Sequence, residues 1–95
     1  MDYQISGNIR DNIRLKLKEN DELVFDKNYA IGNFCLPGCT YEENIVRLME
    51  TMEQDVRNML TDQHIFVADK DIEYILNLVL RKATSMVRYW TNIMA

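Results

Sequence analysis

The sequence predicts a mainly α-helical fold, in which an antiparallel helical hairpin with helices at about 41–61 and 70–93 follows a small N-terminal part. Two observations favour this fold class. Both segments carry apolar residues at spacings of three and four, which places them on one face of a helix. A short connector, Asp62–Ala68, separates the segments and favours antiparallel neighbours.

The first predicted helix begins after Thr40. Thr40 and Glu43 have the spacing of a capping box, in which each side chain accepts a hydrogen bond from the backbone N–H of the other residue. The apolar stripe of this helix consists of residues at alternating spacings of four and three: Ile45, Met49, Met52, Val56 and Met59, flanked by Tyr41, Leu48 and Leu60. The other side carries charged and amide residues and is expected to face solvent.

The second predicted helix has Asp69 as its expected N-cap. Acidic residues lie in its first turn and basic residues in its later half, as the helix dipole favours. Its apolar stripe is longer than that of the first helix: Ile72, Ile75, Leu76, Val79, Leu80, Ala83, Met86, Val87, Trp90 and Ile93. In the connector, the apolar run His64–Val67 is expected to pack over one end of the hairpin, with a short edge strand as the alternative.

Two interpretations of the first 34 residues stay open. Apolar residues recur every four positions at Ile5, Ile9, Ile13 and Leu17, which favours a helix with Asn8 as its cap. The alternation of apolar and basic residues over 13–18 is typical of a strand instead. We favour the helix over residues 5–19.

A small β-hairpin is predicted further on. The apolar triplets 23–25 and 29–31 flank Asp26–Asn28, whose polar residues are common in turns. The segment 32–38 is predicted to be a loop because Pro37 and two glycines interrupt it. No repeat or linker divides the chain, so residues 1–95 are expected to form a single domain.

Composition excludes several classes of function. Apolar residues make up 47% and charged residues 27% of the chain, which is an ordinary globular balance. We see neither a secretory leader nor a segment long and apolar enough to span a membrane, so a cytoplasmic location in the chain's own cell or in a host cell is expected. The net charge is −4 and no basic stripe is present, which disfavours direct nucleic-acid binding.

The candidate ligands and nucleophiles do not complete a site. Cys35, Cys39 and His64 are one ligand short of the usual four around structural zinc, so we expect no metal and no redox role for them. His64 has no nucleophile beside it in a recognisable motif, and three glycines are too few for a phosphate-binding loop. We therefore expect no cofactor and no enzymatic activity.

The apolar sector of the second helix is wider than one antiparallel neighbour can cover. Leu78 and Tyr89 project to one side of the main stripe, Lys82 lies between them and Tyr74 lies farther round. Either the N-terminal segment or a second subunit can cover this flank. We expect self-association into a homodimer with a helical bundle, and we assign Tyr74, Leu78, Lys82, Tyr89 and Trp90 to the surface that binds the second copy or a partner.

These observations favour a non-enzymatic protein–protein interaction module, a small regulatory or inhibitory accessory protein that acts on a protein partner. Nine asparagines and nine isoleucines fit an AT-rich genome, such as many phages and viruses have. The alternative is a helical ligand sensor or transcription regulator with a pocket between helices, lined by Tyr74, Tyr89 and Trp90.

Overall fold

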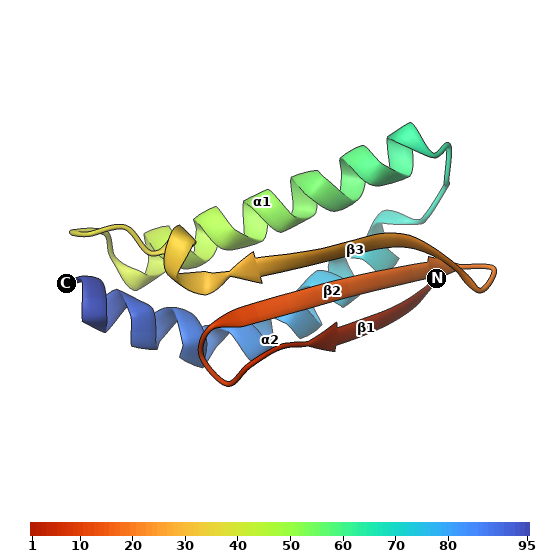
Figure 1. Cartoon of the computed structure of the whole chain (residues 1–95). Helices are drawn as coiled ribbons and strands as arrows, with labels where there is room; N and C mark the ends of the chain where they lie inside the picture. The colour runs from red at the N-terminus through yellow and green to blue at the C-terminus, as the bar shows by residue number, and fades with distance from the viewer.

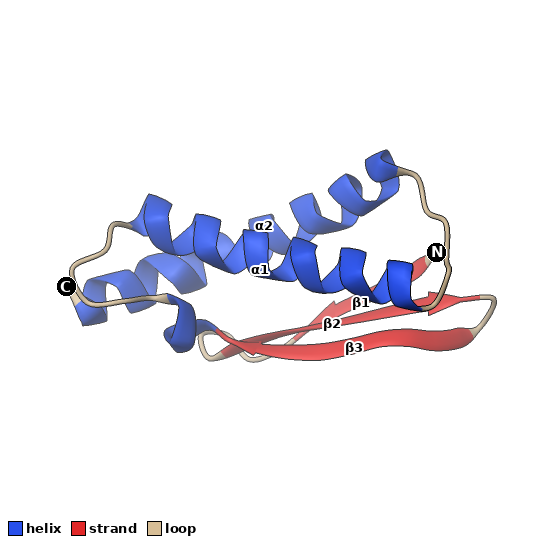
Figure 2. Cartoon of the chain, turned by 90° about the horizontal axis from the view of Figure 1, so that it is seen from above, coloured by secondary structure: helices blue, strands red, loops and turns tan.

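Three antiparallel strands form one layer of the molecule and two long helices form the other (Figure 2). The computed structural model describes all 95 residues, in the order β1 (Asp2–Ser6), β2 (Asn12–Glu19), β3 (Glu22–Ala30), the 3₁₀ helix η1 (Ile31–Phe34), α1 (Tyr41–Asp62) and α2 (Asp69–Met94). The predicted helical hairpin is confirmed. In Figure 1, α1 runs beside β3 and α2 runs behind β1 and β2.

The N-terminal part is a sheet of order β1-β2-β3, so the helix favoured for residues 5–19 is wrong and the strand interpretation is right. In β2, Ile13, Leu15 and Leu17 all point toward the helices and are buried. In a helix they would be spread around the axis. Gly7, which follows β1, stands at a position that requires glycine. Its φ is +137°, and an added Cβ would lie 2.1 Å from the backbone oxygen of Asn12.

The turn between β2 and β3 lies at Asn20 and Asp21, which have φ values of +52° and +63°. A two-residue turn with positive φ at both positions matches the twist of a β-hairpin, and Asn and Asp tolerate this conformation better than most residues. The turn predicted at Asp26–Asn28 is wrong, because β3 runs through it without a break. Phe25 and Tyr29 of this strand are both buried on the side that faces the helices.

The chain enters α1 as predicted. The Thr40 hydroxyl accepts from the Glu43 backbone N–H at 3.2 Å, and the Glu43 carboxylate accepts from the Thr40 backbone N–H at 3.1 Å, so the capping box is confirmed. The region predicted to be a loop starts instead with the last residues of η1. Asn44 is buried on the first turn of α1, where it accepts from the backbone N–H of Leu36 and donates to Thr91 of α2.

The core lies between the two layers. The buried face of α1 is rotated slightly from the predicted stripe and consists of Asn44, Leu48, Met52, Val56 and Leu60. The reason is that α1 packs against β3 as well as α2, so its buried sector points between them, and Ile45, Met49 and Met59 are half-buried. On α2 most of the predicted stripe is buried: Ile72, Ile75, Leu76, Val79, Ala83, Met86 and Val87.

Two details at the start of α2 differ from the prediction. Its N-cap is Ala68, which makes no side-chain capping bond, and Asp69 is the first helical residue. The Asp69 carboxylate accepts instead from the Arg57 guanidinium of α1 at 2.9 Å. The connector contains no strand, and Phe66 is 99% exposed rather than packed over the hairpin, whereas Ile65 and Val67 do pack against the core.

Candidate interaction surfaces

Three of the five predicted surface residues lie one helical turn apart on the side of α2 next to β1. We call this set, Tyr74, Leu78 and Lys82, the α2 flank. The Tyr74 ring is 58% exposed and meets the ring of Tyr3 on β1 edge-on, with centroids 6.2 Å apart. Leu78 is half-buried without packing against the core, and Lys82 is exposed. The α2 flank is therefore open to a neighbouring molecule.

The other two predicted residues, Tyr89 and Trp90, hold the loop between β1 and β2. The indole Nε1 of Trp90 donates to the main-chain oxygen of Arg10 at 2.7 Å, and the Arg10 guanidinium lies 4.3 Å from the centre of the Tyr89 ring. The two rings meet at right angles, and Trp90 also packs on Gly32, where an added Cβ would be 3.2 Å from the indole. The N-terminal segment thus covers this part of α2.

The structure does not bring Tyr74, Tyr89 and Trp90 together around one pocket. Tyr74 precedes Tyr89 by fifteen residues on the same helix, which corresponds to about 22 Å along its axis. Tyr74 contacts the first strand, whereas the other two contact the loop that follows it. The five principal cavities are lined by other residues.

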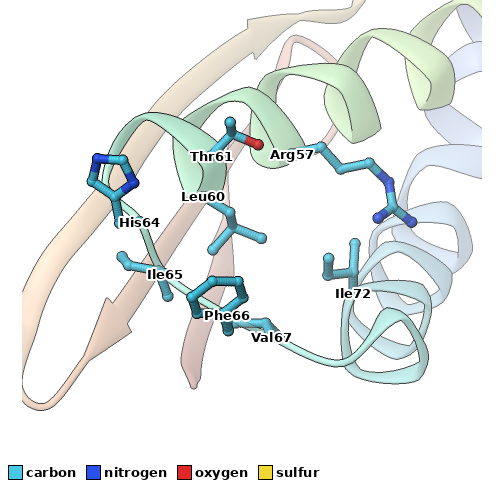
Figure 3. A pocket seen from close by; sticks show the side chains of 8 residues that line it. All are labelled: Arg57, Leu60, Thr61, His64, Ile65, Phe66, Val67 and Ile72. Atoms are coloured by element: carbon cyan, nitrogen blue, oxygen red, sulfur yellow. The ribbon is translucent and has the colours of Figure 1, made fainter.

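A second surface, which was not predicted from the sequence, lies at the tip of the helical hairpin. A shallow cavity of about 390 Å³ opens there between the end of α1 and the start of α2 (Figure 3). Its lining is mostly apolar: Arg57, Leu60, Thr61, His64, Ile65, Phe66, Val67 and Ile72. We call this region the hairpin tip. The apolar run 65–67 was a usable signal, but it was assigned to packing inside the molecule.

The hairpin tip holds Phe66 outward on a fixed stretch of backbone. The backbone N–H of Ile65 donates to the oxygen of Leu60 at 2.9 Å, and His64 adopts φ +55°, so the chain leaves α1 through a closed turn. Ile65 and Val67 anchor the two sides of Phe66 to the core. An aromatic side chain is thereby presented to solvent next to an apolar cavity.

A polar cluster fastens β3 to α1. Lys27 Nζ and Tyr29 Oη each lie 2.7 Å from Oδ2 of Asp55, to which they donate. Burial raises the pKa of Tyr29, and the Asp55 carboxylate raises it further, so the phenol stays protonated. Burial acts to raise the pKa of Asp55 as well, but the hydrogen bonds from Lys27 and Tyr29 outweigh it and hold this pKa below its ordinary value.

The histidine lies far from the two cysteines. Cys35 is buried beside the Val87 backbone oxygen of α2, and burial raises the pKa of its thiol. The Cys39 sulfur accepts from the Arg47 guanidinium at 3.8 Å just before α1 begins. His64 follows the far end of α1, a helix of 22 residues and about 33 Å. The chain has no group of three or more His, Cys, Asp or Glu side chains placed to hold a metal ion.

Neither long helix contains an apolar stretch sufficient to cross a membrane. Comparison of the chain with known protein families, with curated proteins and with solved structures found no match. The function of the α2 flank and the hairpin tip is therefore inferred from the side chains that these two surfaces expose.

Proposed function

We propose that this chain is a non-enzymatic protein–protein interaction module, a small regulatory or inhibitory accessory protein of the cytoplasm that binds a protein partner. The observation that carries the proposal is Phe66, which is 99% exposed at the hairpin tip. Its neighbours Ile65 and Val67 are packed against the core. Large aromatic side chains are enriched where proteins bind one another, because they bury much apolar area at little cost in conformational entropy.

The chemistry of the hairpin tip suits a partner with an apolar pocket. Phe66 supplies a single projecting anchor, and the adjoining cavity offers Leu60 and Ile72 to an apolar side chain of the partner. Arg57 stands at the rim of this cavity, with its guanidinium bound to Glu53 and Asp69. An apolar centre with a charged rim is the usual arrangement of a protein interface.

Self-association belongs to the same proposal. The α2 flank supports it because Tyr74 and Leu78 expose apolar surface on one side of a helix that also carries the free cation Lys82. A homodimer that uses this flank leaves the hairpin tip available. We propose no direct binding of nucleic acid. An origin in a phage or virus would suit an inhibitor of a host protein.

Affinity capture with paired variants tests partner binding. Phe66→Ser removes the anchor at the hairpin tip, and Val46→Ser, at an exposed apolar residue of α1, serves as the matched control. The proposal expects one stoichiometric partner protein with the wild type and with Val46→Ser, and its loss with Phe66→Ser. Equal capture by both variants, or no partner at all, contradicts it. Stabilisation by a nucleotide, metal or other small molecule in a thermal-shift screen would favour the alternative of a ligand sensor.

A further inference from the structure

The two edges of the sheet differ in how they are protected. The edge of β3 carries a register shift near Val24, and the Gln63 side chain donates to the Val24 backbone oxygen at 2.8 Å. Lys27 on the same strand is tied to Asp55 of α1. Bulges, charged side chains and covering groups are the devices that keep an edge strand from pairing with another chain.

Of these devices, the edge of β1 carries only one, the charge of Asp2. Its five residues, Asp2–Ser6, pair with β2 in an unbroken register and contain one charge and no proline. Their backbone makes no hydrogen bond outside the sheet ladder, and no side chain bonds to it. The outward backbone groups of β1 are therefore free to pair with a strand of another molecule.

We propose that β1 pairs antiparallel with β1 of a second copy, so that two three-stranded sheets join into one six-stranded sheet. The inference rests on the self-association proposed above and names its contact. Because β1 has five residues, a two-fold axis through Gln4 pairs the whole strand. Tyr3 then faces Ile5 of the second copy on the helix side, and Asp2 faces Ser6 on the outer side.

The charges of the strand permit this pairing. Asp2 is the one charged residue of β1, and the two-fold axis places the two copies of it four residues apart along the strands. That separation is about 13 Å, which exceeds the screening length of about 8 Å at physiological salt. Like charges therefore do not meet across the new contact.

The same symmetry axis brings the two α2 helices side by side and antiparallel. β1 and α2 run in the same direction, because Tyr3 contacts Tyr74 near the start of the helix and Arg10 contacts Tyr89 near its end. The axis through Gln4 lies one strand residue beyond Tyr3 and so crosses α2 near Leu76, which places Tyr74 opposite Leu78 of the second copy. Burial of these two apolar side chains against each other is favourable.

The charge distribution of α2 is complementary to itself in this orientation. Residues 69–77 hold three acidic side chains and one basic one, whereas residues 79–94 hold three basic side chains and no acidic one. Antiparallel pairing places the acidic first half of each helix against the basic second half of the other. A parallel arrangement would oppose like charges.

Antiparallel pairing reverses the direction of β1 in the second copy, so the two hairpin tips point in opposite directions. The hairpin tip lies beside the N-terminal end of β1 in Figure 1, so each tip is closer to the two-fold axis than the C-terminal end of α2 is. Each copy therefore offers its own hairpin tip to a partner molecule.

Disulfide cross-linking tests this contact. Residues directly opposite in an antiparallel pair have Cα atoms about 4.5–5.5 Å apart, which is within the range of a disulfide. Gln4→Cys should therefore form a covalent dimer on mild oxidation. The control Lys16→Cys lies on β2, on the same outer face and directly opposite Gln4 of β1, and its two copies would be about 14 Å apart. Both changes are made with Cys39→Ser, which leaves the buried Cys35 as the one other thiol.

A non-reducing gel reads the result. The proposal expects most of the Gln4→Cys chains to run as a dimer and the Lys16→Cys chains to stay monomeric. Equal cross-linking of both variants, or none in Gln4→Cys, overturns the pairing through β1. If light scattering of the unmodified protein still shows a dimer in that case, self-association stands and its contact lies elsewhere. A monomer in both measurements overturns self-association too.

Discussion

The indole Nε1 of Trp90 donates to the main-chain oxygen of Arg10 at 2.7 Å, and this bond joins the end of α2 to the loop between β1 and β2. Trp90 is half-buried. Trp90→Ala should lower the free energy of unfolding by about 2–3 kcal/mol, below the range for a fully buried aromatic residue. Trp90→Phe keeps most of the packing and should cost about 1 kcal/mol for the lost hydrogen bond. Urea denaturation measures both.

Ile93→Ala is the control for Trp90, since Ile93 lies on the same helix and is 52% exposed. It should change the free energy of unfolding by less than about 0.5 kcal/mol. A loss for Trp90→Ala as small as that of the control would contradict the role of Trp90 in holding the N-terminal segment.

The cluster around Asp55 predicts a loss of stability in acid. Lys27 and Tyr29 hold the pKa of Asp55 below the value of about 3.9 found in unfolded chains. The ionised carboxylate thus stabilises the fold above about pH 4, and this contribution is lost as the pH falls through the lower pKa of the folded state. Asp55→Asn should be less stable at neutral pH and should lose less stability in acid than the wild type. Urea denaturation between pH 7 and pH 2.5 measures the free energy of unfolding of both proteins. If it falls equally in the wild type and in Asp55→Asn, the cluster is not the cause of the loss of stability in acid.

The capping box predicts a local effect on α1. Thr40→Ala removes the hydroxyl that accepts from the Glu43 backbone N–H, and it should lower the free energy of unfolding by about 1 kcal/mol. Thr40→Ser keeps the hydroxyl and should be close to the wild type. Thermal unfolding followed by circular dichroism compares them, and the idea fails if the two variants are equally destabilised.

Phe66 should contribute to binding and not to stability. Its side chain is 99% exposed, so Phe66→Ser should change the free energy of unfolding by less than about 0.5 kcal/mol. Ile65→Ser next to it should cost more, because Ile65 packs against the core. Chemical denaturation of the two variants side by side makes the comparison. A large loss for Phe66→Ser would mean that the hairpin tip is a structural element.

The helical hairpin could be predicted because its signals are local. The capping box of Thr40 and Glu43, and the spacing of the apolar residues after it, are complete within one segment of the chain. The N-terminal sheet is different. Ile5, Ile9, Ile13 and Leu17 fit the period of a helix, and only the packed structure shows that Ile9 is 88% exposed and does not belong with the others. The sequence of this segment allows both a helix and a strand. Packing against the two helices favours the strand, because it buries one face of the sheet.

The cover of α2 could not be predicted in detail. From the N-terminal segment, Trp90 meets the main-chain oxygen of Arg10 and the backbone of Gly32, so no side chain marks these two contacts in the sequence. The turn at Asn20 and Asp21 did have a signal, since both residue types accept positive φ, but the polar run after it resembled a turn more strongly. At the hairpin tip, the apolar run Ile65–Val67 predicts that these residues are buried. The sequence does not show that the middle residue, Phe66, points into solvent.

The molar mass in solution shows whether this chain is an interaction module that self-associates through α2. Light scattering coupled to size exclusion at tens of micromolar should give twice the 11.3 kDa of one chain. Leu78→Asp should give the mass of one chain with an unchanged circular dichroism spectrum, because a carboxylate is costly where a second copy excludes water. The control Val46→Asp, on the exposed side of α1, should remain a dimer. A monomeric wild type, or a dimer whose mass Leu78→Asp leaves unchanged, would show that the chain does not self-associate through α2.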